Sequence, residues 1–162
     1  MTANVDPGGC VVRLGPADAD RYSDHLMRLD QAARRMRFFD DVPDFQVLLH
    51  AGAALADGRV VIGYLADGEI RGGCELLLRD PQQHAAEAAF SVEAEFRRRG
   101  IGGRLMAAMI AEAHRLGLRR IEMSCLKSNL PMQALAARFT SDLRQDGETT
   151  LAVLANDAAL PG

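Results

Sequence analysis

The chain has 162 residues, of which 48% are hydrophobic and 25% charged, a balance typical of a soluble globular protein of one domain. Its formal net charge of −3 argues against bulk binding of nucleic acid, because it implies no wide basic surface. No stretch approaches the roughly 18 apolar residues that a membrane span requires, and no secretory leader is recognisable. We therefore expect a cytoplasmic protein that binds neither nucleic acid nor membrane.

The three cysteines, Cys10, Cys74 and Cys125, are scattered and include no Cys-x-x-Cys pair. They indicate neither a disulfide framework nor a zinc site, and we expect no metal. Cys125 is interpreted as a buried structural cysteine, with an approach to the reactive centre as the less favoured alternative. None of the four histidines has a recognisable partner in the sequence, so none is assigned a role.

Residues 1–9 are expected to form a flexible N-terminal tail, residues 10–155 a single domain, and residues 156–162 a C-terminal tail. The expected elements of the N-terminal half are, in order, a strand over 10–14, a helix over 16–38, a helix over 43–56, and strands over 59–66 and 70–78.

Two features of this half carry particular expectations. Asp67-Gly68 between the last two strands is a strong hairpin signal. Arg34, Arg35 and Arg37 are interpreted as a solvated face of the helix over 16–38, and a lip of a ligand site is the alternative.

The C-terminal half is expected to contain a strand over 85–93, a helix over 100–116, a strand over 119–125, a helix over 130–139, and a hairpin of 142–145 with 149–154. The helix over 100–116 is the crossover that a parallel strand pair requires. The earlier strands can pair antiparallel through hairpins. The predicted fold is therefore α/β, with a mixed, mostly antiparallel central sheet and one parallel strand pair around a crossover helix.

An arginine- and glycine-rich turn, Arg97-Arg98-Arg99-Gly100-Ile101-Gly102-Gly103-Arg104, lies between the strand over 85–93 and the crossover helix. The first N–H groups of a helix have no intrahelical partners, and the helix dipole adds positive potential there. Glycines let a phosphate approach the backbone, and the arginines supply charge. The turn predicts a site for a phosphorylated ligand.

Other phosphate-binding motifs fit this turn poorly. A nucleotide-hydrolysing P-loop requires Gly-Lys followed by Ser or Thr, whereas Gly103 is followed by Arg104 and Leu105. A dinucleotide fingerprint would have its third glycine at position 105 and would open the fold. A turn that serves packing and solubility alone is the remaining alternative.

The turn and its surroundings resemble the GNAT superfamily of acyl-CoA-dependent N-acyltransferases. That family carries Gln/Arg-x-x-Gly-x-Gly/Ala between a strand and a helix, and residues 97–102 match every defined position. The segment from Asn129 to Ala136 resembles the family's asparagine-led helix. The resemblance covers roughly residues 11–139 and implies the GNAT fold.

The resemblance also implies a donor, acetyl-CoA or another acyl-CoA, and where it binds. The pyrophosphate would bind at the turn, and the pantetheine arm would follow the preceding strand. Asn129 would lie near the pantetheine or the thiol, and a plain helix N-cap is an equally favoured interpretation of this residue. The implied binding residues are Phe90, Ser91, Val92, Arg97, Arg98, Arg99, Gly100, Ile101, Gly102, Gly103, Arg104 and Asn129.

Acyl transfer to an amine requires a general base, because a primary amine is mostly protonated near neutral pH. Glu87 is the candidate base, since related acyltransferases have a glutamate facing the acceptor at this place on the strand. Glu75 is the reserve candidate and Glu93 a weaker one. Main-chain N–H groups near Ser91 or Val92 could stabilise the developing oxyanion.

Two departures from the family pattern bear on activity. The tyrosine that often protonates the departing thiolate is replaced by Ala136, and the usual Gly-Phe after this helix is Thr140-Ser141. A catalytically weak acyl-CoA sensor or regulatory module is therefore the alternative to an N-acetyltransferase. The acceptor, a small molecule or a protein lysine or N-terminus, stays open, as does a homodimer, which is frequent in the family.

Overall fold

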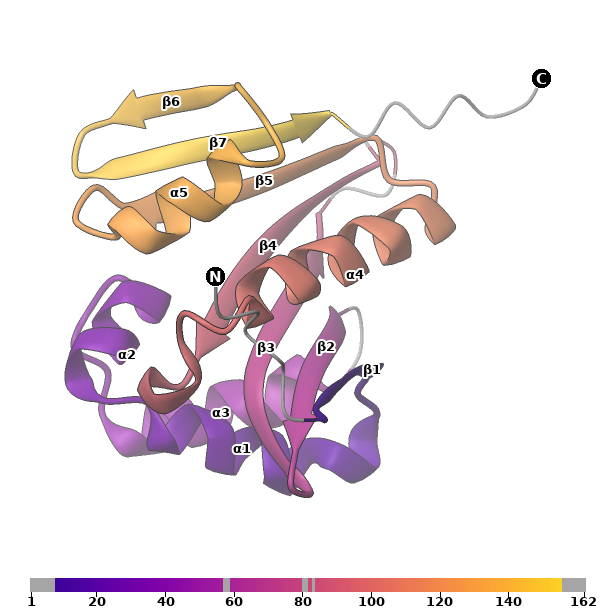
Figure 1. Cartoon of the computed structure of the whole chain (residues 1–162), viewed down its shortest axis with the longest axis vertical. Coiled ribbons are helices and arrows are strands. Elements are labelled where there is room, and N and C mark those ends of the chain that lie inside the picture. The colour runs from indigo at the N-terminus through magenta and orange to yellow at the C-terminus, as the bar shows by residue number, and fades with distance from the viewer. Residues whose placement is uncertain (1–7, 57–58, 80–81, 83, 156–162) are drawn as a thin grey trace.

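The computed structural model describes residues 8–56, 59–79, 82 and 84–155. The tails expected over 1–9 and 156–162 lie outside this description, except for Gly8 and Gly9. The elements are β1 (Cys10–Arg13), α1 (Ala19–Arg28), α2 (Gln31–Phe38), α3 (Asp44–Ala54), β2 (Arg59–Ala66), β3 (Glu69–Leu78), β4 (Ala85–Val92), α4 (Ile101–Arg115), β5 (Arg120–Leu126), α5 (Leu130–Ala137), β6 (Leu143–Asp146) and β7 (Thr149–Ala155) (Figure 1).

The strands form one seven-stranded sheet in the order β1-β2-β3-β4-β5-β7-β6. Every neighbouring pair is antiparallel except β4 and β5, which are parallel and joined through α4. The hairpin turn between β2 and β3 has positive φ at both Asp67 and Gly68, as its sequence signal predicts. The predicted mixed sheet with one parallel pair is confirmed.

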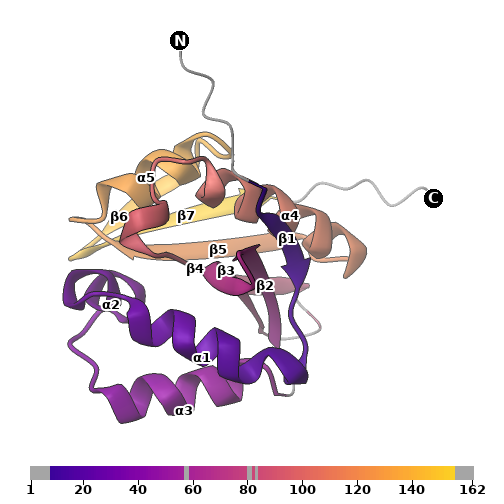
Figure 2. The same cartoon turned by 60° about the horizontal axis from the view of Figure 1, so that its bottom comes forward.

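Helices cover both faces of the sheet (Figure 2). Leu105, Met106 and Met109 of α4 are fully buried in one core, against the strands. Tyr22 and Leu26 of α1 belong to a second core on the opposite face, where α3 also packs. Because apolar side chains recur on one face of each helix, burial of these faces fixes both layers.

The prediction of a single helix over 16–38 is wrong. The chain makes a short 3-10 turn at Pro16–Asp18 and then two helices, with Leu29 extended between them. Asp30 Oδ1 accepts a hydrogen bond from Ala33 N at 2.7 Å and so caps the start of α2. An aspartate cap satisfies a first-turn N–H that a continuous helix would bond internally, so it favours a new helix here.

Glu75 of β3 is a buried carboxylate that links three helices to the sheet, with only 5% of the residue exposed. It accepts hydrogen bonds from the Tyr22 hydroxyl of α1, from Arg37 Nη2 of α2 at 2.6 Å, and from His50 Nε2 of α3 at 2.9 Å. Because a carboxylate only accepts, the Nε2 atom of His50 carries the hydrogen. One side chain therefore receives a bond from each helix on this face.

Burial alone would raise the pKa of Glu75, but the adjacent Arg37 guanidinium and the bonds from His50 and Tyr22 outweigh it and lower the pKa to about 2. One expectation is corrected here. Arg37 is not on a solvated face, since only 9% of its side chain is exposed. His50 has a partner, which the sequence could not reveal because Glu75 lies on another element.

The contribution of the Asp30 cap to the stability of the protein should be measurable with a single substitution. Replacing Asp30 by alanine leaves the Ala33 N–H without its partner, so we expect Asp30→Ala to lower the free energy of unfolding by about 1 kcal/mol. Asp24→Ala, at an exposed position within α1, is the matched control and should change little. Urea unfolding followed by circular dichroism checks both. Equal stability of the two variants would contradict the capping role.

The charged state of Glu75 predicts a pH dependence of stability. Its pKa is depressed in the folded chain, so its contribution is present above the ordinary value of 4.5 and is lost as the pH falls from 4.5 toward about 2. The shift corresponds to a loss on the order of 3 kcal/mol. Glu75→Gln should therefore be less stable than wild type at pH 7 and show a shallower loss of stability in acid.

Urea unfolding at a series of pH values tests this prediction. Glu69→Gln, at a position on the same strand whose side chain is 44% exposed, is the control and should follow the wild-type profile. Parallel acid profiles for wild type and Glu75→Gln would show that Glu75 is not the group responsible.

Candidate active site

Strands β4 and β5 are paired over a short distance only. Their parallel register covers Ala85 with Arg120, Ala86 with Ile121, and Glu87 with Glu122. Beyond these pairs β4 continues against β3 as far as Val92, and β5 continues against β7 as far as Leu126. Figure 1 shows the two strands close at one end and apart at the other. The facing backbone groups beyond Glu87 therefore need partners from outside the sheet.

A cavity of about 80 Å³ lies where the strands separate. Its walls come from four elements: Met36, Arg37 and Phe39 at α2, Glu87, Ala88, Ala89 and Phe90 of β4, Ser124 and Cys125 of β5, and Asn129 and Met132 at α5. A larger hollow of about 470 Å³ is lined by Leu29, Gln31, Arg34, Asp41, Val42 and Pro43, none of which belongs to the sheet. We assign the site to the smaller cavity because it contains the open strand edges.

The arginine- and glycine-rich turn leads from β4 into α4, as predicted. Gly100 precedes the helix with φ of +77°, a conformation that suits glycine. A Cβ on Gly102 would lie 3.1 Å from Leu135 Cδ2, so this glycine allows the start of α4 to approach α5 closely. The first-turn N–H groups of α4 point out of the helix, since they have no intrahelical acceptors. The turn therefore fits an anionic group.

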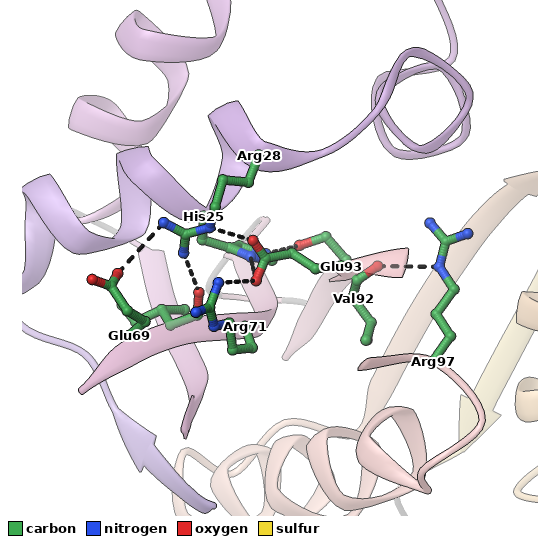
Figure 3. Close-up of polar contacts among 9 residues, drawn as sticks. His25, Arg28, Glu69, Arg71, Val92, Glu93 and Arg97 are labelled. Carbon is green, nitrogen blue, oxygen red and sulfur yellow. Dashed lines mark hydrogen bonds and ion pairs between the residues drawn. The ribbon is translucent and has the colours of Figure 1, made fainter. Parts of the chain in front are cut away.

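The arginines of the turn take different positions. Arg97 and Arg98 are exposed, and Arg97 Nε donates to the Val92 carbonyl at 3.2 Å (Figure 3). The Arg99 guanidinium lies 4.9 Å from the centre of the Phe96 ring. Arg104 donates to the Gly9 carbonyl at 3.2 Å and lies over Tyr64. Four positive groups thus surround the turn.

Glu93 anchors the end of β4 to α1 and β3 (Figure 3). This residue is 6% exposed and accepts a hydrogen bond from Arg28 Nε of α1, while Arg71 Nη1 of β3 lies 3.6 Å from its carboxylate. His25, which is fully buried, forms a 2.8 Å hydrogen bond with the Ser91 hydroxyl. His25 therefore also has a partner, which could not be recognised from the sequence.

This network has an electrostatic consequence. Burial by itself would raise the pKa of Glu93, but His25 and Arg28 outweigh it and lower the pKa. The burial of His25 lowers the pKa of its imidazole. The strand end from Ser91 to Glu93 is therefore held between α1 and β3, next to the strand edge that faces the cavity.

Glu87 lies at the last paired position of β4, directly where the strands separate. It is half-buried, forms an ion pair with the exposed Arg79, and contributes to the cavity wall. Within the described residues, it is the one acidic side chain of that wall. Glu75, with a pKa of about 2, is a poor proton acceptor at neutral pH.

Asn129 and Ala136 occupy the two ends of α5. Asn129 Oδ1 accepts from Met132 N at 3.2 Å, so it caps the helix, and it also contributes to the cavity wall. Ala136 is 2% exposed and carries no proton donor. Cys125 is buried, and this burial raises the pKa of its thiol. The cavity therefore offers a carboxylate and an amide, but no tyrosine.

Among the described residues, no helix is both long and apolar enough to cross a membrane. The same residues contain no group of three or more His, Cys, Asp or Glu side chains that could hold a metal ion.

Comparison with known proteins places this geometry in a family. The sequence model described as Acetyltransferase (GNAT) family matches residues 22–140. Comparison with curated protein sequences finds no match.

Several solved structures share the fold. The GNAT domain of S. lividans PAT superposes with a TM-score of 0.79 at 18% identity, covering 93% of this chain and 92% of that one. A putative acetyltransferase from Salmonella typhimurium, solved with its cofactor acetyl-CoA, gives 0.70 at 17% identity, covering 93% and 95%. The ribosomal-protein-S5-alanine acetyltransferase from Vibrio fischeri gives 0.71 at 15% identity, covering 93% and 94%.

The family match spans the separated strands, the turn and the asparagine-led helix, in the order in which the fold brings them together. The chain belongs to the GNAT family of acetyltransferases.

Proposed function

We propose that this acetyltransferase transfers the acetyl group of acetyl-CoA directly to a primary amine. The observation that carries the proposal is the fork between β4 and β5, which has Glu87 at its apex and leads to the glycine-rich start of α4. An open strand edge, an anion site and a carboxylate are the three parts that such a transfer needs.

The donor's binding follows from the open edge and the turn. The backbone N–H groups of residues 98–103 and the arginines around them would hold the pyrophosphate. The pantetheine arm carries amides, which would pair with the free edge of β4 around Phe90–Val92 in the way an added strand would. Asn129 would lie beside it. The Salmonella structure with acetyl-CoA supports this assignment by fold.

The chain's own residues would then perform the transfer. Bound acetyl-CoA supplies an activated thioester carbonyl. Glu87 accepts a proton as the amine nitrogen forms its bond to the carbonyl carbon, and an N–H near Ser91 or Val92 stabilises the oxyanion. The carbon–sulfur bond breaks, and the departing thiolate takes its proton from solvent, because Ala136 supplies none.

The class of acceptor, a small amine or a protein, stays a prediction. The Vibrio relative acts on an alanine of a ribosomal protein by its name, which supports a protein acceptor for the fold without excluding a small amine. Function in the cytoplasm and formation of a homodimer likewise stay predictions. A sensor that binds acyl-CoA without turnover is the second candidate, and the buried Ala136 in place of a tyrosine favours it.

Donor binding should depend on the small size of Gly102. A branched side chain at this position would crowd Leu135 and the first-turn N–H groups, so we expect Gly102→Val to weaken acetyl-CoA binding at least about tenfold, comparable to losing one charge-assisted hydrogen bond. Titration calorimetry measures the affinity. Gly52→Val, at an exposed helical glycine with open space around it, is the control. Equal affinities of the two variants for acetyl-CoA would show that the turn is not part of the donor site.

Catalysis should depend on Glu87. Glu87→Gln removes the proton acceptor, so we expect kcat to fall by roughly 10²- to 10⁴-fold while acetyl-CoA affinity is retained. Thiol release from acetyl-CoA across a panel of primary amines gives the rate. Glu122→Gln changes the paired residue on β5, which is outside the cavity wall, and should keep wild-type turnover.

Two outcomes would change this assignment. Unchanged turnover in Glu87→Gln would exclude Glu87 as the base. Tight binding of acetyl-CoA by the wild-type protein without thiol release for any amine would instead favour the sensor.

A further inference from the structure

The outward side of α3 is apolar, although this helix lies at the outside of its layer (Figure 2). Its inward residues Val47, Ala51 and Ala54 are fully buried in the core that α3 shares with α1. The opposite side carries five exposed residues, which we call the outer face of α3: Phe45, Leu48, Leu49, Gly52 and Ala53.

These five residues form one continuous surface of the helix. They recur at positions i, i+3, i+4, i+7 and i+8, which is the spacing of a helical stripe. Phe45 is 61% exposed, Leu48 49% and Leu49 69%. On the neighbouring helix α1, by contrast, the exposed positions are charged: Asp20, Asp24 and Arg28. A helix that is apolar on both sides is ordinarily covered on both sides, so the outer face of α3 indicates an interface.

Charge limits the kind of partner that suits this face. None of its five side chains is charged, and the exposed Gln46 beside them is neutral. Asp44, at the start of the helix, is held within its own protomer, where Oδ1 accepts a hydrogen bond from Arg34 Nη1 at 2.5 Å. A nucleic acid or a charged peptide finds no group to pair with here, whereas an apolar protein surface buries the face without leaving a charge unpaired.

Side-chain size changes along the outer face in a way that suits a second copy of the same helix. The large side chains Phe45, Leu48 and Leu49 occupy the N-terminal half, and Gly52 and Ala53 occupy the C-terminal half. A Cβ on Gly52 would meet nothing within 4 Å, so the surface is open there. When two such helices lie antiparallel about a two-fold axis, the large half of each meets the small half of the other. The face is therefore complementary to itself, as a two-fold interface requires.

The area of the outer face is sufficient for a dimer. From their exposed fractions, its three large side chains present on the order of 350 Å² of apolar surface. Two copies would bury about 700 Å² of it, and because roughly 60% of a homodimer interface is apolar, the total would be about 1,200 Å². That total is at the lower end of the range for specific interfaces, which favours a reversible dimer.

We propose that two copies of this chain associate through the outer face of α3, with the two helices antiparallel about a two-fold axis. Phe45 packs on Gly52 of the partner subunit, and Leu48 and Leu49 of both copies meet at the axis. The interface lies on the face of the sheet opposite α4, so it does not involve the glycine-rich start of that helix. The proposal is independent of the reaction proposed above.

Sedimentation equilibrium of the wild-type protein and of two glutamate variants tests the proposal. We expect the wild type to dimerise with a dissociation constant of about 1–100 µM. Leu49→Glu brings two like charges together at the axis and should raise this constant at least about 100-fold. Gln46→Glu introduces the same residue at an exposed position of α3 outside the outer face and should keep the wild-type constant. Circular dichroism and titration with acetyl-CoA verify that each variant is folded.

Filling the open space at Gly52 tests the predicted packing from the other side of the interface. A valine there occupies the position of Phe45 of the partner subunit, so Gly52→Val should raise the dimer dissociation constant at least about tenfold. Its affinity for acetyl-CoA should remain that of the wild type, because α3 and α4 lie on opposite faces of the sheet.

A charge exchange tests the two-fold arrangement. Leu49→Lys should be monomeric for the same reason as Leu49→Glu, but an equimolar mixture of the two variants should dimerise, because opposite charges then meet at the axis. A wild-type protein that stays monomeric up to about 500 µM would overturn the proposal and leave this face to a different partner. A dimer that Leu49→Glu does not weaken would place the interface elsewhere, and a mixture that stays monomeric would exclude the antiparallel packing.

Discussion

The separation of β4 from β5 is the constraint on which the rest of this structure depends. Each strand is fully paired on its outer side, β4 with β3 and β5 with β7, and the two share only three residue pairs with each other. Their facing backbone groups beyond Glu87 must find partners outside the sheet. The open edges line one cavity together with residues of α2 and the cap of α5.

Two buried carboxylates hold the fork in place. Glu75 ties α1, α2 and α3 to β3, and Glu93 ties the end of β4 to α1 and β3. Buried charges of this kind add little net stability, because desolvation offsets much of the attraction, but removing one partner leaves an uncompensated charge. Their contribution is best understood as fixing the position of the helices. Glu87, at the apex of the fork, is the one acidic side chain of the cavity wall among the described residues.

The local patterns of the chain were sufficient for most of the fold. Asp67-Gly68 predicted the β2–β3 hairpin, and the apolar periodicity after Gly100 predicted α4 and therefore the parallel pair. The one element predicted wrongly was the helix over 16–38, because its apolar spacing continues across Asp30 while the aspartate side chain caps a new helix. The capping aspartate was present in the sequence, but periodicity does not show whether a continuous helix or a capped new helix prevails.

The sequence by itself determined the family and the turn that leads from β4 into α4, because the segment from Arg97 to Arg104 is a contiguous motif whose chemistry depends on local backbone geometry. Only the tertiary structure decided the partners of His25, His50 and Arg37. Ser91 lies 66 positions from His25, and Glu75 lies 38 positions from Arg37, so no local pattern links them. Contacts of this kind form when helices pack onto a sheet, and one of them holds Arg37 beside the cavity between β4 and β5.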